Sequence, residues 1–316
     1  MRAITIFSHS AGDQRLTAED LARMLKKAGY DAEIHAPGAV DFERLAVKDD
    51  DVIVAAGGDG TVTKVVMEAP TGATIGVIPL GTANNIGNSL GIEGRPEDII
   101  AGWRTAAAKT IDIWRCTGPW GERRFIEGCG IGVLTWATHH MDELSLKGYS
   151  PDHEISMARA ALKEKLAHSQ PVAAKLRLDD HTIEGRFLLL EMLNFGAVGP
   201  RIPLAWSADP SDGLIEIGYV AEDRYNDFCE WLSTGASPFD DSPVTLLRSR
   251  NVALEWTDAR FRIGDDYWPA TGEAVPQGSH RATISLASFG PRVLIPSPET
   301  VWRFRNFRPW RGFMVQ

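Results

Sequence analysis

The chain is 316 residues long, and its hydrophobic (44%) and charged (24%) fractions are those of a folded protein rather than a disordered one. This length is enough for two domains, because single hydrophobic cores stop growing at about 250–300 residues. The formal net charge of −9 argues against nucleic acid as a partner, because that binding depends mainly on cations that neutralise phosphates.

The cysteines and the apolar runs indicate the cellular compartment in which the protein is expected. Its three cysteines have neither zinc-site spacing nor the even count of a disulfide framework, which is typical of a reduced, intracellular protein. The N-terminal apolar run is too short for a signal peptide, and no stretch reaches the roughly 18 apolar residues of a membrane span. We therefore expect a cytoplasmic protein, in which any contact with lipid is peripheral and at the inner membrane surface.

The first part of the chain alternates strand and helix patterns. A helix is expected after Thr17, because Thr17 and Asp20 have the spacing of a capping box and apolar residues follow at i, i+3, i+4 and i+7. Short apolar runs predict strands at 3–7, 32–35, 51–56 and 74–78. Strands that alternate with helices predict a parallel sheet covered by helices, so residues 1–108 are expected to form an α/β nucleotide-binding domain.

Strand patterns dominate the chain from about residue 109 onward. They occur at 111–115, 124–127, 172–178, 182–190, 214–220, 244–247, 252–256, 260–263 and 281–287. Two helical patterns interrupt them, at about 153–168 and 223–234. Residues 109–292 are therefore predicted to form a mostly antiparallel, β-sandwich-like domain that holds the substrate. The segment 293–316 begins with another apolar run and is expected to complete the first domain.

The most informative segment is a glycine-rich loop that directly follows the strand at 51–56. Its sequence, Gly57-Gly58-Asp59-Gly60-Thr61, places three glycines around one aspartate at the start of a helical pattern. Glycines let backbone N–H groups approach a phosphate closely, and a helix N-terminus adds a favourable dipole. Asp59 could position Mg²⁺ or act on a substrate hydroxyl. The alternative is a tight turn in which Asp59 only caps its helix.

A second loop of the same kind lies one βα unit further on. Pro79-Leu80-Gly81-Thr82-Ala83-Asn84 follows the strand at 74–78, and its Thr82 and Asn84 suit either capping a helix or holding a nucleotide. Because the carboxyl ends of parallel strands meet at one edge of a sheet, the two loops are expected to form one site. Neither loop is a Walker A sequence or the dinucleotide pattern, and the glycines at 128–132 lack the βα context of the latter.

Together, the two loops resemble the superfamily of diacylglycerol kinases and sphingosine kinases. The first loop also occurs in NAD kinases, but the Pro-Leu-Gly-Thr partner favours the lipid-kinase branch. Further matches follow in order along nearly the whole chain, at Asn194-Phe195-Gly196, Gly199, Pro203, Asp209–Leu214, Gly272-Glu273 and Val293–Pro296. The resemblance implies two domains with an ATP site between them, and Mg²⁺-dependent transfer of the γ-phosphate to the hydroxyl group of a diacylglycerol-like lipid.

The motif positions of the family also imply roles for residues of this chain. Asp59, Thr271 and Glu273 stand at positions implied for catalysis. Asp212, with the backbone carbonyls of Asp209 and Leu214, resembles a structural magnesium site made of the oxygen ligands that this ion prefers. The alternative is a turn that leads into the next strand. The resemblance implies nucleotide binding by Gly58, Gly60, Thr61, Gly81, Thr82 and Asn84, and we expect Ser8, Gly57 and Lys64 to contribute to the same site.

This chain departs from the family pattern at positions that would carry negative charge. The family's Asp-Gly-Glu block, whose aspartate is proposed as the general base, stands here as Thr271-Gly272-Glu273. A threonine hydroxyl cannot accept a proton at neutral pH as a carboxylate can. The Asn-Glu that usually follows the first loop is here Thr63-Lys64, and the usual Asn-Asp of the second loop is Asn84-Asn85.

These departures leave three interpretations open. Asp59 or Glu273 could supply the base, with Lys64 offsetting some of the phosphate charge. The chain could instead act on another hydroxyl compound, or it could bind nucleotide or lipid as a regulator without catalysis. We favour retained activity, because a loose phosphoryl-transfer transition state depends mainly on positioning and charge stabilisation. Loss of a base slows such a reaction by ~10²–10⁴-fold without abolishing it.

The C-terminal segment 302–313 interleaves four arginines with five aromatic residues in an otherwise acidic protein. Such a segment suits the membrane interface, where rings sit at headgroup depth and arginines meet lipid phosphates. The alternative is a tail that packs on the protein's own surface. Of the remaining residues, Trp136 could line an acyl pocket, and Glu127 is expected to lie on the surface at a strand edge. The oligomeric state is left open, with a homodimer as one alternative.

Overall fold

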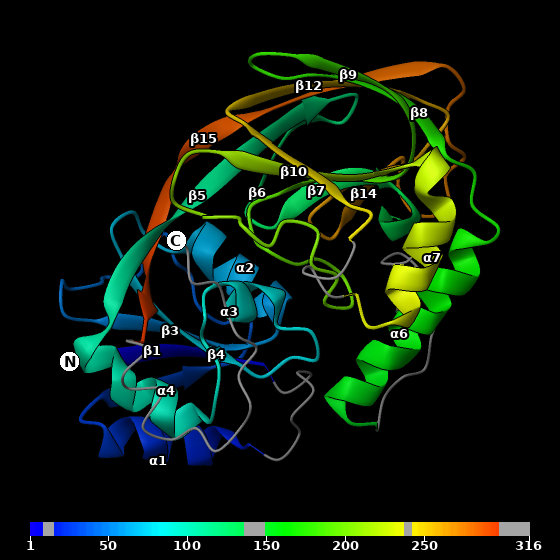
Figure 1. Cartoon of the computed structure of the whole chain (residues 1–316). Coiled ribbons are helices and arrows are strands. Elements are labelled where there is room, and N and C mark those ends of the chain that lie inside the picture. Colours follow the sequence, from blue (N-terminus) through cyan, green and yellow to red (C-terminus); the bar gives the residue numbers. More distant parts are fainter. Residues whose placement is uncertain (9–15, 136–148, 237–241, 297–316) are drawn as a thin grey trace.

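The structure is a computed structural model that describes residues 1–8, 16–135, 149–236 and 242–296. The predicted roles of Trp136 and of the segment 302–313 fall on residues outside these ranges. Figure 1 shows an N-terminal unit of strands and helices beside a β-rich unit, with two long strands running from one unit into the other. Among the described residues, no helix is both long and apolar enough to cross a bilayer.

The N-terminal unit is a parallel sheet, as the alternating patterns predicted. Its strands are ordered β4-β3-β1-β2 and span β1 (Arg2–Phe7), β2 (Asp31–His35), β3 (Val52–Gly57) and β4 (Thr74–Pro79). Every residue of β3 is buried, which fits its central place in the sheet. The helices of this unit are α1 (Ala18–Lys27), α2 (Asp59–Glu68), α3 (Asn85–Ser89) and α4 (Pro96–Gly102).

Helix α1 begins where the sequence predicted. The side chain of Thr17 accepts a hydrogen bond from the Asp20 N–H at 3.1 Å, and the Asp20 carboxylate accepts one from the Thr17 N–H at 3.3 Å, so the capping box is complete. Leu21 and Leu25 bury the apolar face of the helix in the first core. Gly29 follows the helix with φ +89°, a backbone conformation that favours glycine.

The β-rich unit is antiparallel, which confirms the predicted class of the second part of the chain. Its strands in chain order are β5 (Ala107–Gly118), β6 (Gly121–Phe125), β7 (Gly128–Gly132), β8 (Val172–Arg177), β9 (Thr182–Leu193), β10 (Ile215–Ala221), β11 (Thr245–Ser249), β12 (Asn251–Thr257), β13 (Phe261–Ile263), β14 (Asp266–Trp268) and β15 (Ser279–Ile295). Helices α6 (Pro151–Leu166) and α7 (Tyr225–Ser233) pack with it. Two further hydrophobic cores lie in this unit.

Strand β15 joins the two units into one mixed sheet. Along most of its length it pairs antiparallel with β5 and β12, but at its end it lies parallel to β4, with Val293 opposite Ile75. The chain therefore returns to the N-terminal unit at residues 292–293. This arrangement fixes how the carboxyl ends of β3 and β4 face the β-rich unit.

Two details of the β-rich unit differ from the sequence-based expectation, and both bear on the site. The strand expected at 124–127 ends at Phe125, so Ile126 and Glu127 form a short link between β6 and β7. The glycines at 128–132 make up strand β7 itself. A Cβ on Gly128 would lie 2.7 Å from the carbonyl oxygen of Met192, so glycine there lets β7 approach β9 closely.

Candidate active site

The two glycine-rich loops meet at the carboxyl edge of the parallel sheet, as predicted. The N–H of Leu80 donates to the carbonyl oxygen of Gly57 at 2.9 Å. A Cβ placed on Gly81 would lie 2.5 Å from the Cα atom of Gly58, closer than two such atoms can approach. Glycine is therefore needed at position 81, because any side chain there would force the loops apart.

Asp59 joins the first loop to the second. One oxygen of its half-buried carboxylate accepts the Asn85 N–H and the other accepts the Ile86 N–H, both at 2.9 Å. Asp59 therefore caps the start of α3 rather than only its own helix. Loss of solvent raises the pKa of Asp59, and the charge of Asp265 raises it further, whereas the two backbone hydrogen bonds and Arg201 lower it.

The second loop is held internally by Asn84. Its side-chain oxygen accepts the Gly81 N–H at 2.8 Å, and its amide donates to the Gly81 carbonyl oxygen at 2.6 Å. Asn84 has φ +51°, in the left-handed region that asparagine tolerates better than most residues. The hydroxyl of Thr82 donates to Glu154 of α6 at 2.7 Å. The loop is thus rigid at Gly81 and tied to the β-rich unit at Thr82.

An arginine of the β-rich unit also holds the second loop. Arg201 donates to the carbonyl oxygens of Thr82 and Ala83, at 2.8 and 2.9 Å. Its φ of +53° is unusual for a side-chain-bearing residue. The guanidinium of Arg159 donates to the Arg201 carbonyl oxygen at 2.6 Å, which holds this strained backbone in place. Neither arginine was identified from the sequence, because neither belongs to the glycine-rich loops or to a motif from which site residues were predicted.

Two carboxylates of the β-rich unit face the first two turns of α2. The Thr63 hydroxyl donates to Glu127 at 2.7 Å. One oxygen of Asp265, in the turn between β13 and β14, lies 3.8 Å from where a Cβ on Gly60 would stand. Gly60 and Thr63 are three positions apart and share a face of the helix. Together with Asp59, these side chains bring three acidic residues to the place where the loops meet.

The environment of Glu127 favours its neutral form. Loss of solvent and the charges of Asp59 and Asp265 raise the pKa of Glu127 to about 7, although the hydrogen bond from Thr63 and the charge of Arg262 lower it. The prediction that Glu127 lies on the surface at a strand edge is wrong, because the residue is half-buried and reaches α2.

A buried ion pair supports the turn that carries Asp265. The guanidinium of Arg262 lies 2.6 Å from the Glu191 carboxylate, and their side chains are only 5% and 0% exposed. Arg262 also donates to the Gly264 carbonyl oxygen at 2.9 Å, while the Gly264 N–H donates to the Gly128 carbonyl oxygen at 2.9 Å. These contacts fix the β13–β14 turn beside the start of β7, next to Glu127.

Other residues predicted for the site lie around it or apart from it. Thr271 and Glu273 are exposed on the loop after β14, where the Glu273 carboxylate accepts the Ala270 N–H at 3.0 Å. Lys64 lies on α2 and approaches Glu68 at 3.9 Å. The Ser8 N–H donates to the Ala56 carbonyl oxygen, which places Ser8 beside the end of β3. The roles assigned to these residues stay predictions.

The predicted magnesium loop has one oxygen that a cation would satisfy. Asp112, on β5, accepts the Gly213 N–H at 2.8 Å with one carboxylate oxygen, and its other oxygen is buried without a partner among the described residues. Loss of solvent and the nearby charges of Asp212 and Asp209 raise the pKa of Asp112 to about 6. Asp112 therefore fits the role of an additional oxygen ligand in the predicted magnesium site, and it was not identified from the sequence.

Other features of the same loop favour the turn interpretation. Lys109 already pairs with Asp209 at 2.7 Å, and Asp212 accepts the Leu214 N–H at 2.9 Å. In the described part of the chain, no three acidic, histidine or cysteine side chains are placed to hold a metal ion. The magnesium site therefore stays a prediction, and Asp112 would be one of its donors.

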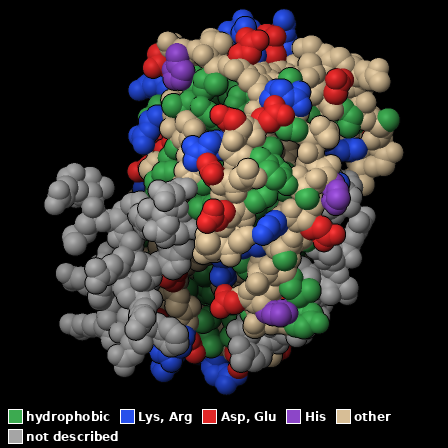
Figure 2. Space-filling view, turned by 45° about the vertical axis from the view of Figure 1, so that its right-hand side comes forward, with side chains coloured by type: hydrophobic (Ala, Val, Ile, Leu, Met, Phe, Trp, Pro, Cys, Tyr) green, Lys and Arg blue, Asp and Glu red, His purple; other side chains and the backbone are tan. Residues whose placement is uncertain are grey.

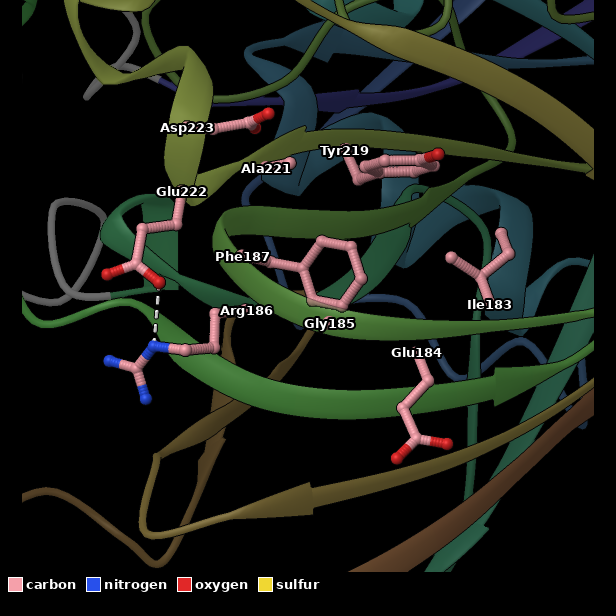
Figure 3. A pocket seen from close by; sticks show the side chains of 9 residues that line it. All are labelled: Ile183, Glu184, Gly185, Arg186, Phe187, Tyr219, Ala221, Glu222 and Asp223. Carbon is pink, nitrogen blue, oxygen red and sulfur yellow. Dashed lines mark hydrogen bonds and ion pairs between the residues drawn. The ribbon is translucent and has the colours of Figure 1, made fainter.

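A separate hollow of about 560 Å³ lies on β9 and β10, away from the residues predicted for the site. Figure 3 shows that two of its polar groups, Arg186 and Glu222, point toward each other, and they pair at 2.8 Å. The rings of Phe187 and Tyr219 meet edge to face in the same hollow. On the face drawn in Figure 2, basic and acidic side chains are interspersed, so that face has no continuous patch of one sign.

Comparisons with known proteins identify the family to which the chain is similar. A family model for the diacylglycerol kinase catalytic domain matches residues 2–116. The diacylglycerol kinase of Bacillus subtilis (strain 168) is 30% identical over 232 residues, which cover 68% of this chain and 72% of that protein. That of Staphylococcus aureus (strain MRSA252) is 34% identical over 152 residues, and the match spans 46% of its length and 44% of this chain.

Solved structures show the same fold. A crystal structure of a diacylglycerol kinase from Bacillus anthracis str. Sterne matches with a TM-score of 0.58 and 16% identity. The match covers 95% of this chain and 98% of that one, so it includes both the parallel sheet and the β-rich unit. At this level of identity the likeness concerns the fold alone.

Proposed function

The chain belongs to the diacylglycerol kinase catalytic-domain family, and from this premise we propose that it is an ATP-dependent lipid kinase. The reaction would move the γ-phosphate of ATP to the hydroxyl group of a diacylglycerol-like lipid. The observation that carries the proposal is the contact between Gly58 and Gly81, which joins two glycine-rich loops into one surface at the edge of the sheet.

That surface supports a nucleotide site for a physical reason. Glycines in both loops leave the backbone accessible, so that N–H groups can approach phosphate oxygens without a side chain between them. Asp59 uses both carboxylate oxygens to fix the start of α3, and we propose that it positions the loops. Mg²⁺ that enters with the nucleotide would offset the charge on its phosphates.

The proposal is tested by following the labelled γ-phosphate of Mg·ATP into a panel of diacylglycerol, monoacylglycerol and sphingoid bases. Phosphorylated lipid is the expected product. Replacing Asp59 with Asn removes one of the two acceptors that hold α3, and we expect ~10²-fold or greater loss of transfer, because misplacing reacting groups by about 1 Å can cost that much. A melting temperature close to that of the wild type would show that the variant is folded.

The other outcomes separate the remaining interpretations. ATP binding without labelled product would favour a regulator that has lost catalysis, whereas labelled product without any lipid would favour a soluble hydroxyl acceptor. A lipid acceptor also requires contact with a membrane, for which we propose the segment 302–313. Deleting the residues after Pro296 should then weaken binding to anionic liposomes, and unchanged binding by the folded truncated protein would exclude this segment.

A further inference from the structure

The carboxylate of Glu127 enters the site from a position that the family pattern did not mark. The residue lies in the link between β6 and β7, and its backbone is fixed there because its carbonyl oxygen accepts the Asn194 N–H at 2.9 Å. Its side chain reaches across to α2, where one oxygen accepts the Thr63 hydroxyl at 2.7 Å. Thr63 is itself one of the departures from the family's usual sequence. Glu127 thus brings a carboxylate to Thr63, the neighbour in sequence of Lys64, where the helix has lost the family's usual glutamate.

Glu127 also has an oxygen available for chemistry, unlike Asp59. Both oxygens of Asp59 accept backbone N–H groups, so protonating it would disturb the start of α3. Only Oε1 of Glu127 is engaged by Thr63, and Oε2 accepts no hydrogen bond from the described residues. Thr271 and Glu273 are exposed on a different loop. Glu127 is therefore the carboxylate that is both oriented and open.

The charges that face Glu127 make it suited to receiving a proton. Asp59 approaches from α2, Asp265 from the β13–β14 turn, and Arg262 from β13. Loss of solvent disfavours the charged form of Glu127 most, and the two carboxylates disfavour it further. The hydrogen bond from Thr63 and the charge of Arg262 offset these effects only in part. The resulting pKa of about 7 lets Glu127 take up a proton and release it again near neutral pH, which is the condition for an effective general base.

We propose that Glu127 is the proton acceptor of the kinase reaction, an inference that rests on the proposed function. A lone pair of the lipid hydroxyl oxygen attacks the γ-phosphorus, and a new O–P bond forms. The bond from that phosphorus to the bridging oxygen of ADP breaks, and its electron pair stays on ADP. The hydroxyl proton passes to Oε2 of Glu127 and is later released to solvent.

The first test replaces Glu127 with Gln, which keeps the size of the side chain and an acceptor for Thr63. We expect kcat to fall by ~10²–10⁴-fold, while the Kd for ATP and the melting temperature stay close to those of the wild type. Glu184→Gln is the matched control, because Glu184 pairs with Lys175 at 2.6 Å on β8 and β9 and lies apart from the loops. It should keep the wild-type rate.

A pH profile separates proton transfer from a structural role. The wild-type rate should fall below a pH near 7, because the base must be deprotonated to act. Asp265→Asn removes a negative charge that raises the pKa of Glu127, so the acidic limb of the pH–rate profile should move to lower pH. Thr63→Val removes a hydrogen bond that lowers the same pKa, so the limb should move to higher pH. A merely structural residue would give neither of these opposite shifts.

Other results would contradict either the role of Glu127 or the kinase function itself. A wild-type rate in Glu127→Gln, or a limb that neither Asp265→Asn nor Thr63→Val moves, would overturn the role of Glu127. Loss of transfer in Asp265→Asn with full transfer in Glu127→Gln would place the base on the β13–β14 turn instead. If the wild-type chain transfers no phosphate to any lipid of the panel, the kinase function fails, and this inference fails with it.

Discussion

The two units of the molecule contribute different kinds of groups to the site. The N-terminal unit contributes backbone: two contiguous loops whose glycines bring main-chain atoms together, as at Gly58 and Gly81. The β-rich unit contributes single side chains, such as Glu127 and Arg201, that extend from links and turns. We call the two glycine-rich loops the backbone half of the site and the side chains from the β-rich unit its side-chain half. The backbone half depends on the absence of side chains at the loop contact, whereas the side-chain half depends on which side chains are present.

This difference explains how the chain can depart from its family's pattern and keep the arrangement of the site. A surface made from backbone tolerates little change, because a Cβ on Gly81 would force the two loops apart. A carboxylate supplied by a side chain can instead come from another element that faces the same place. Glu127 beside Thr63 is such a case, since the carboxylate approaches α2 from β6–β7 rather than from α2 itself.

The largest effect on stability is expected from Arg262→Met. This variant loses the buried ion pair that fixes the β13–β14 turn, which carries Asp265 in the side-chain half. It would leave the buried Glu191 charge without a partner, and breaking a buried ion pair in this way typically costs about 3–5 kcal/mol. Urea unfolding at pH 7 measures the loss. Since burial already raises the pKa of Glu191, the loss should shrink as pH falls and this carboxyl group becomes neutral.

A double variant serves as the control for Arg262→Met. Replacing Glu191 with Leu in the same chain removes the uncompensated charge, and most of the lost stability should return. A single variant whose unfolding free energy lies within about 1 kcal/mol of the wild type would mean that Glu191 reaches solvent or another cation. In that case the β13–β14 turn would not depend on this pair.

A smaller effect is expected when the backbone half is broken by Gly81→Ala. The new Cβ would lie 2.5 Å from the Cα atom of Gly58, so the loops must separate. Overpacking of this kind costs about 1–3 kcal/mol, and ATP binding should weaken with it. Gly185→Ala on β9 is the matched control, because its Cβ would meet only the Phe187 ring at 3.6 Å, an ordinary contact. Equal ATP affinity in both variants would contradict the proposed role of the loop contact.

The backbone half could be predicted from the sequence, because its determinants are local. Glycines directly after buried strands mark both loops, and the helix cap at Thr17 and Asp20 is complete within four residues. The rule that parallel strands end at one edge then brings the loops together without knowledge of the rest of the fold. The contact of Gly58 with Gly81 confirms that step.

The side-chain half could not be predicted, because its members meet only through strand pairing. Arg262 and Glu191 are 71 positions apart and face each other because β13 and β9 both pair with β7. One sequence does not fix such a register. A weak signal was available in Arg262, a charged residue between the apolar Phe261 and Ile263, since a cation in a buried strand requires an anion nearby.

The smallest effect is expected at the contact that joins the two halves. Arg201→Lys keeps the charge but loses the fork that donates to the Thr82 and Ala83 carbonyl oxygens, and we expect about 1 kcal/mol of lost stability and ~10-fold weaker ATP binding. Arg186→Lys is the control, because its exposed pair with Glu222 contributes little. Titration of ATP by calorimetry measures both variants. If Arg201→Lys binds ATP as the wild type does, Asn84, Asp59 and the hydrogen bond from Thr82 to Glu154 suffice to hold the second loop, and the arginine fork is not needed for nucleotide binding.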